Sequence, residues 1–66
     1  MNYTIIIETS NKPKHHLINI TKKTEIDDAY INWKTNYEYL NNGNIIQAFV
    51  IKNNDNGKSS IYKYYK

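Results

Sequence analysis

The sequence predicts an α+β fold in the order ββαββ, with a single helix packed on a four-stranded antiparallel sheet. Three observations lead to this prediction: two β-rich pairs of segments, one central segment of helical period, and short turn-forming connections within each pair. At 66 residues the chain has room for one hydrophobic core. We therefore expect residues 1–66 to form a single small α+β domain.

The four β-rich segments contain many β-branched and aromatic residues. They are residues 3–9, 15–21, 45–52 and 59–65. Turn-forming sequences occupy residues 10–14 and 53–57. Because both connections are short, each pair is expected to form an antiparallel hairpin.

The central segment has the period of an amphipathic helix. Its apolar residues recur at the spacing of one helical face, at Ile26, Ala29, Tyr30, Trp33, Tyr37 and Leu40. Thr24-Glu25-Ile26-Asp27 matches a capping box with Asp in place of Glu, and acids in a first turn suit the helix dipole. Asn41-Asn42-Gly43 is expected to end the helix in a left-handed cap.

The second hairpin has two possible registers. A two-residue turn at Asn56-Gly57 places Tyr62 and Tyr64 on the face of Phe49. A type I turn followed by a glycine bulge shifts the pairing by one residue and places both tyrosines beside Val50 instead. The sequence leaves both registers open.

The predicted sheet has more apolar side chains than one helix covers. Ile5 and Ile7 face one side while Ile6 faces the other, and residues 45–51 are apolar on both sides as well. A sheet with one solvated face alternates apolar and polar residues. We therefore expect the second face to be covered, most simply by another copy of the chain in a homodimer. The sequence does not indicate which face the helix covers.

Charge is divided along the chain. Residues 1–23 contain four lysines and one acid, residues 24–43 contain four acids and one lysine, and residues 44–66 contain four lysines and one acid. The whole chain carries a formal charge of +3. Because the acidic block is the predicted helix, we expect surfaces of opposite sign, which is typical of proteins that dock on others.

Composition narrows the class of protein. Ile, Asn, Lys and Tyr make up 38 of the 66 residues and Arg is absent, which indicates an AT-rich genome such as that of a low-GC bacterium, its phages or its plasmids. The absence of cysteine excludes disulfides and thiolate metal sites. No apolar run approaches a membrane span and no signal peptide is recognisable, so we expect a soluble cytoplasmic protein.

No catalytic, metal-binding or cofactor-binding motif is recognisable in the sequence. The adjacent His15 and His16 point to opposite sides of a strand and are expected to be surface residues. Asp27 and Asp28 diverge by about 100° around a helix. Both glycines, Gly43 and Gly57, are assigned to turns, so neither belongs to a phosphate-binding loop. We therefore expect no enzyme, no metal and no cofactor.

The favoured function is non-enzymatic protein binding by an accessory or regulatory protein. Small phage or mobile-element proteins that inhibit a host protein complex, as anti-defence proteins do by occupying its surface, have this general character. Exposed aromatic and apolar side chains are typical contact anchors. The expected contact residues on the helix are Ile31, Tyr39, Glu38 and Asp28.

The alternative function is nucleic-acid binding. A basic sheet rich in Tyr and Lys can stack bases and neutralise phosphates. The contact residues would then be Lys52, Lys58, Tyr62, Lys63, Tyr64 and Lys66. The absence of Arg weighs against sequence-specific reading of duplex DNA.

Overall fold

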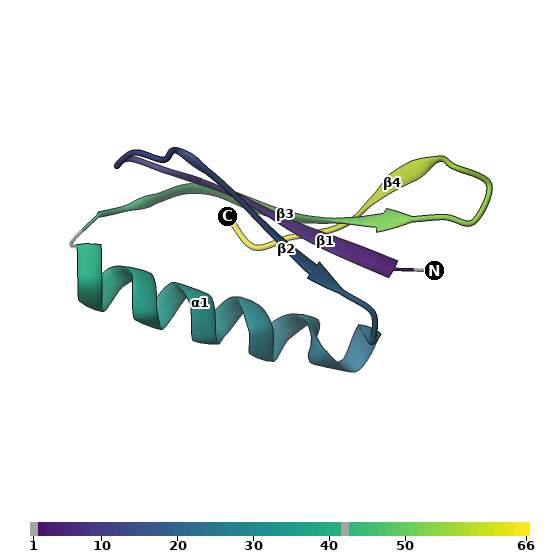
Figure 1. Ribbon diagram of the computed structural model, residues 1–66, viewed down its shortest axis with the longest axis horizontal. Coiled ribbons are helices and arrows are strands. Elements are labelled where there is room, and N and C mark those ends of the chain that lie inside the picture. The colour runs from purple at the N-terminus through teal and green to yellow at the C-terminus, as the bar shows by residue number, and fades with distance from the viewer. Residues whose placement is uncertain (1, 42) are drawn as a thin grey trace.

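The computed structural model describes residues 2–41 and 43–66. Its elements are β1 (Asn2–Thr9), β2 (His15–Ile20), a 3-10 turn η1 (Lys23–Glu25), α1 (Ile26–Asn41), β3 (Ile45–Asn53) and β4 (Ser59–Tyr64). The strands form one antiparallel sheet in the order β2-β1-β3-β4, and α1 lies along one face of it (Figure 1). The predicted ββαββ fold is therefore confirmed.

The alternation of β1 and β3 determines which sheet face α1 covers. The described apolar residues that are buried on this side are Tyr3, Ile5, Ile7, Ile26, Tyr30, Tyr37, Ile45, Ala48 and Val50. Three of them come from α1 and lie at the spacing of one helical stripe. The helix is held to the sheet chiefly by the burial of this stripe, since helix propensity alone contributes little.

Leu40 does not belong to the buried stripe, although the sequence pattern assigned it there. Its side chain is 73% exposed. Leu40 follows Tyr37 by three positions and is therefore rotated by about 60° from it, toward the flank of α1 that faces the β1–β2 turn. On this flank it lines a pocket with Pro13 and Trp33.

The capping box predicted at residues 24–27 is wrong. Thr24 lies inside η1, which has no side-chain cap, and the Glu25 N–H donates to the Lys22 carbonyl at 3.0 Å. The Asp27 carboxylate turns toward the end of β4 and accepts hydrogen bonds there. The helix therefore begins from a backbone turn, and the acid expected to cap it has other partners.

The left-handed helix cap predicted at residues 41–43 includes Asn42, which lies outside the described residues. Gly43 itself is required for space. A Cβ at this position would lie 2.5 Å from the Tyr37 hydroxyl oxygen and 2.7 Å from the Asn11 side-chain nitrogen.

The turn of the second hairpin is the type I turn with a glycine bulge. The Gly57 N–H donates to the Asn54 carbonyl at 3.1 Å, and the Asn54 N–H donates to the Lys58 carbonyl at 2.8 Å. The positive φ of Gly57 is the conformation that a bulge residue needs after such a turn. The first of the two alternative turns, with Asn56-Gly57 alone, is therefore not the one formed.

A second irregularity then changes the register of β4. Ile51 pairs with Ile61, whereas Val50 pairs with Lys63, so Tyr62 is an extra residue in the ladder. Beyond this bulge the pairing is that of the two-residue turn. The hairpin thus combines the turn of one predicted alternative with the later register of the other.

No helix of the described residues is long and apolar enough to span a membrane.

Candidate docking surfaces and an aromatic pocket

The sheet face opposite α1 is not covered by any other described element (Figure 1). A row of apolar side chains crosses all four strands on this face, because Leu17 pairs with Ile6, Ile6 with Phe49, and Phe49 with Tyr64. Directly opposed residues of neighbouring strands point to the same side. The ends of the row are open to solvent, with Leu17 68% and Tyr64 62% exposed.

A second row lies beside the first. It runs through Asn19, Thr4, Ile51 and Ile61, and it is polar on the β2 side and apolar on the β4 side. The Thr4 hydroxyl donates to Asn19 Oδ1 at 2.9 Å and accepts from Asn53 Nδ2 at 3.1 Å. These two hydrogen bonds satisfy the polar groups of the second row. Together the two rows contain six apolar residues, here called the open-face patch: Ile6, Leu17, Phe49, Ile51, Ile61 and Tyr64.

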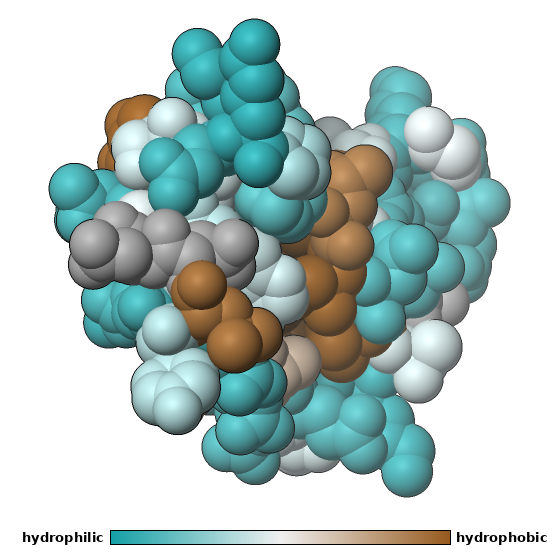
Figure 2. Space-filling view, turned by 60° about the vertical axis from the view of Figure 1, so that its left-hand side comes forward, coloured by the Kyte–Doolittle hydropathy of each residue, from teal (hydrophilic) through white to brown (hydrophobic). Residues whose placement is uncertain are grey.

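Apolar side chains reach the surface of the molecule as a connected group. Figure 2 shows one such band, with hydrophilic side chains on both sides of it. Soluble monomers rarely expose large contiguous apolar patches, and such patches commonly mark contact sites. The exposed large apolar residues of the described chain are Leu17, Ile31, Tyr39, Leu40, Ile46, Ile61 and Tyr64.

The four helix residues expected to contact a protein lie on one side of α1. From their spacing, Asp28, Ile31, Glu38 and Tyr39 fall within about 100° of one another around the helix. All four are exposed, Tyr39 by 86%. This outer face of α1 therefore presents two apolar side chains and two carboxylates.

The residues of the alternative nucleic-acid surface are divided between the two sides of the sheet. Tyr62 packs edge-on against Tyr3 in the core, with ring centroids 5.2 Å apart. Lys63 turns toward α1, where its Nζ lies 3.0 Å from Asp27 Oδ1. Tyr64 lies on the opposite, open face. The bulge at Tyr62 causes this division, because it places two consecutive β4 residues on the α1 side.

The remaining lysines of that set lie at different places on the sheet. Lys52 pairs with Tyr3 and so lies on the core side of its strand. Lys58 follows the bulge glycine of the β3–β4 turn, whereas Lys66 lies beyond the other end of β4, where its N–H donates to the Ala48 carbonyl. No single face of the described sheet therefore presents these lysines together with the tyrosines.

A clamp between β4 and α1 was not predicted from the sequence. The Tyr65 hydroxyl and the Lys63 ammonium both donate to Asp27 Oδ1, at 2.5 and 3.0 Å, and the Tyr65 ring stacks on Tyr30 at 4.0 Å. The hydrogen bond from Tyr65, followed by that from Lys63, lowers the pKa of Asp27. Burial, followed by the hydrogen bond to Asp27, raises the pKa of Tyr65 well above its usual range. We call these four residues the β4–α1 clamp.

The clamp reduces the charge division expected from the sequence. Asp27 belongs to the acidic block and Lys63 to a basic block, yet they form an ion pair across the α1–β4 contact. The exposed acids of α1 that lie away from this contact are Asp28 and Glu38. The acidic surface is therefore narrower than the sequence suggests.

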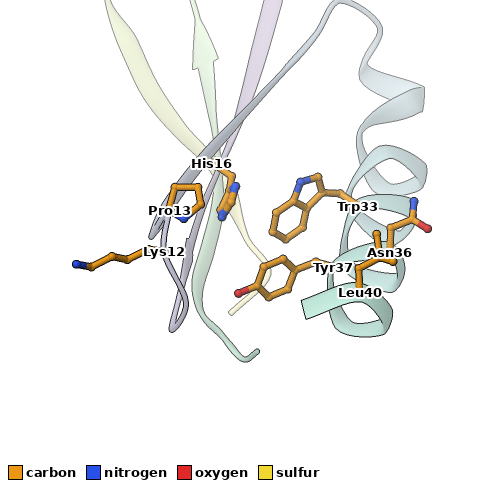
Figure 3. A pocket seen from close by; sticks show the side chains of 7 residues that line it. All are labelled: Lys12, Pro13, His16, Trp33, Asn36, Tyr37 and Leu40. Atoms are coloured by element: carbon orange, nitrogen blue, oxygen red, sulfur yellow. The ribbon is translucent and has the colours of Figure 1, made fainter. Parts of the chain in front are cut away.

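A pocket of about 270 Å³ lies between the β1–β2 turn and the later turns of α1 (Figure 3). Its lining residues are Lys12, Pro13, His16, Trp33, Asn36, Tyr37 and Leu40. The Trp33 and Tyr37 rings stack at 5.0 Å, and the His16 ring lies 4.8 Å from Trp33. Sequence reasoning placed Trp33 and Tyr37 in the core and His16 on the surface. It missed the pocket because nothing in the sequence pairs the hairpin turn with this flank of the helix.

These features define the class of the protein as a single-helix α+β domain with an open sheet face. Comparison with protein-family models, with curated proteins and with solved structures finds no match to the chain. Within residues 2–41 and 43–66, no group of three or more His, Asp or Glu side chains is placed to hold a metal ion.

Proposed function

We propose that the protein is a non-enzymatic accessory or regulatory protein of the cytoplasm that acts by occupying protein surfaces, and that it does so as a homodimer. The observation that carries this proposal is the open-face patch. Its six apolar side chains are neighbours across all four strands, and no described element covers them. Burial of such a surface against a protein is favourable in proportion to the apolar area removed from water.

The occupant that we propose for the open-face patch is a second copy of the chain. None of the six residues is charged, so two copies related by a twofold axis bring no like charges together within the patch. Two sheets stack face to face at about 10 Å when their inner faces are apolar. The open face therefore suits a symmetric packing of two sheets with the helices outside.

The size of the face sets the expected strength of the dimer. Six-residue strands are about 20 Å long and the outer strands of four lie about 14 Å apart. A face of this size buries less than the roughly 800 Å² per partner of a standard interface. We therefore propose a dimer that dissociates in the micromolar range.

In this dimer the outer face of each α1 remains free to contact a different protein. Asp28 and Glu38 favour a partner surface with basic groups, and Ile31 and Tyr39 supply apolar anchors. Inhibition of a host protein complex by a phage or mobile-element protein is the form of regulation that we propose. It is supported by the composition of the chain and by its two separate docking surfaces.

The experiment that tests the dimer is sedimentation velocity over a wide range of protein concentration. The wild type is expected to shift from monomer to dimer, and Leu17→Lys is expected to abolish the shift. Leu40→Lys is a matched control, because Leu40 is a similarly exposed leucine on the α1 side. A monomer at every concentration, or equal effects of the two substitutions, would contradict the proposal.

Nucleic-acid binding has weaker support as a second function. Tyr62 and Lys63, two of its central residues, are already engaged on the α1 side of the sheet. Of the three consecutive residues Tyr62, Lys63 and Tyr64, only Tyr64 faces the open side of the sheet. No specific contact in the described chain favours this function over protein docking.

A further inference from the structure

We propose that the pocket beside the β1–β2 turn, here called the hairpin pocket, binds a small planar aromatic anion. The ligand class is a single ring system that carries one carboxylate or one phosphate group. This site is separate from the open-face patch, since it lies at the junction of the turn and α1 (Figure 3). It would give the protein a ligand-binding activity in addition to protein docking.

The walls of the hairpin pocket are rings. Pro13 and His16 come from the hairpin, and Trp33 and Tyr37 come from α1 (Figure 3). The planes of Trp33 and Tyr37 differ by 8°, whereas His16 is tilted by 56° to Trp33. Aromatic walls in parallel and tilted orientations accept a further ring by offset stacking or by edge contact.

The hairpin wall is held in place before any ligand binds. The Thr9 hydroxyl is buried and lies 3.0 Å from the Asn11 carbonyl and 3.2 Å from the Pro13 carbonyl. The hydroxyl also lies 3.2 Å from His16 Nε2, and this contact fixes the orientation of the imidazole ring. A fixed wall lowers the entropic cost of binding.

The size of the pocket limits the ligand. A volume of about 270 Å³ is slightly below the range of roughly 300–1,000 Å³ that is typical of sites for drug-sized molecules. One ring system with a short substituent fits this volume, whereas a dinucleotide or a longer chain does not. The pocket therefore selects a small ligand.

The charge around the pocket favours an anion. Lys12 is among the lining residues, Lys14 is exposed in the same turn, and none of the lining residues is acidic. In Figure 3 the stem of Lys12 borders the pocket and its ammonium group extends outward. A ligand whose ring lies against Trp33 can thus place its anionic group at the mouth, within reach of this ammonium group.

Trp33 provides a direct readout, because it is the only tryptophan of the chain. Its indole N–H signal is followed by NMR while the full chain is titrated with indol-3-yl phosphate and, separately, with indole-3-acetate, which share one ring system. Saturable shifts with either probe support the proposal, and the tighter probe identifies phosphate or carboxylate as the preferred group. Absence of a saturable shift with both probes overturns it.

Two sets of reference probes separate the contributions of ring and charge. Indole, which lacks the charge, is expected to bind about threefold more weakly, as loss of one unit charge interaction near 6 Å in water implies. Inorganic phosphate and acetate, which lack the ring, are expected to cause no saturable shift. Equal binding of the neutral ring, or saturable binding of the ringless anions, overturns the assignment of the ligand class.

Charge substitutions at Leu40 test the location of the site. Leu40 is mostly exposed, so both Leu40→Lys and Leu40→Glu are expected to fold. They differ by two unit charges at the pocket wall, and affinity for the charged ring probe is expected to differ by about tenfold between them. The matched pair Tyr39→Lys and Tyr39→Glu lies one position away on the outer face of α1 and is expected to differ by less than about twofold. Equal Lys-to-Glu affinity ratios at positions 40 and 39 would overturn this location of the binding site.

Discussion

The hydroxyl of Tyr65 donates a hydrogen bond of 2.5 Å to Asp27 Oδ1, and this contact fastens the end of the sheet to the first turn of α1. The same oxygen accepts from Lys63, and the Tyr65 ring lies flat on Tyr30. These contacts depend on the β4 bulge at Tyr62, since the bulge turns Lys63 toward the helix. An irregularity in one edge strand thereby allows the sheet to be fastened to the first turn of α1.

Removal of the Tyr65 hydroxyl is expected to loosen this attachment. Tyr65→Phe keeps the ring stacked on Tyr30 but deletes the donor to Asp27, so we expect the melting temperature to fall by about 2–5 °C. The exposure of Asp27 keeps the effect small. Thermal unfolding followed by circular dichroism measures it. Tyr64→Phe is the control, because its hydroxyl is on the open face, and it should leave the melting temperature unchanged.

The clamp also predicts a dependence of stability on acid. The pKa of Asp27 in the folded protein is lower than its ordinary value of 3.8, so its ionised form stabilises the fold. This contribution is present above the unfolded pKa and is lost as the pH falls through the folded pKa. We expect the melting temperatures of the wild type and Asp27→Asn to differ at neutral pH and to converge in acid. A constant difference from pH 7 down to about pH 2 would exclude the proposed role of the ionised carboxylate.

The close packing around Gly43 predicts that a larger residue at this position lowers the free energy of unfolding. A Cβ at this position would lie 2.5 Å from the Tyr37 hydroxyl oxygen, so Gly43→Ala forces the buried Tyr37 side chain or the backbone at residue 43 to shift. We expect a loss of about 1–3 kcal/mol in the free energy of unfolding. Urea denaturation measures it. Gly57→Asn serves as the control, because the space around Gly57 is open and Asn tolerates a positive φ of 84° better than other side chains.

The fold was predictable because its signals are local. The β-branched run Ile5-Ile6-Ile7, the helical spacing from Ile26 to Tyr37 and the turn at Gly57 each identify their own element without reference to the rest of the chain. The second apolar face was also visible, since Ile6 alternates with its buried neighbours.

The parts that escaped prediction depend on contacts between distant elements. The bulge at Tyr62 accompanies the packing of Tyr62 on Tyr3 and of Tyr65 on Tyr30, which no local pattern reports. The hairpin pocket requires Pro13 and His16 of the hairpin to meet Trp33 of α1. Leu40 was assigned to the core from its helical spacing, but it lies on the flank of α1 beside this pocket. Contacts between distant elements therefore determine the bulge and the hairpin pocket, whereas local periodicity determines the fold.

The division of the Tyr and Lys residues of β4 between the two sheet faces leads to a prediction about nucleic-acid binding. Because Lys63 is paired with Asp27 and Tyr62 is packed on Tyr3, we expect labelled single-stranded oligonucleotides to bind weakly and non-specifically. That binding should disappear near physiological salt, as expected when diffuse phosphate attraction is its only source. Fluorescence anisotropy at low and moderate salt measures this.

A substitution at Tyr64 separates the two functions. Tyr64 belongs to the open-face patch and is the tyrosine of β4 that is free to stack on a base. Tyr64→Ala is expected to weaken self-association and to leave oligonucleotide binding unchanged, whereas Lys58→Ala, in the distant turn, should leave self-association unchanged. Micromolar oligonucleotide affinity that survives moderate salt and is lost in Tyr64→Ala would instead assign the open face to single-stranded nucleic acid. The same face cannot be buried against a second copy while it stacks bases, so oligonucleotide binding would then compete with dimer formation.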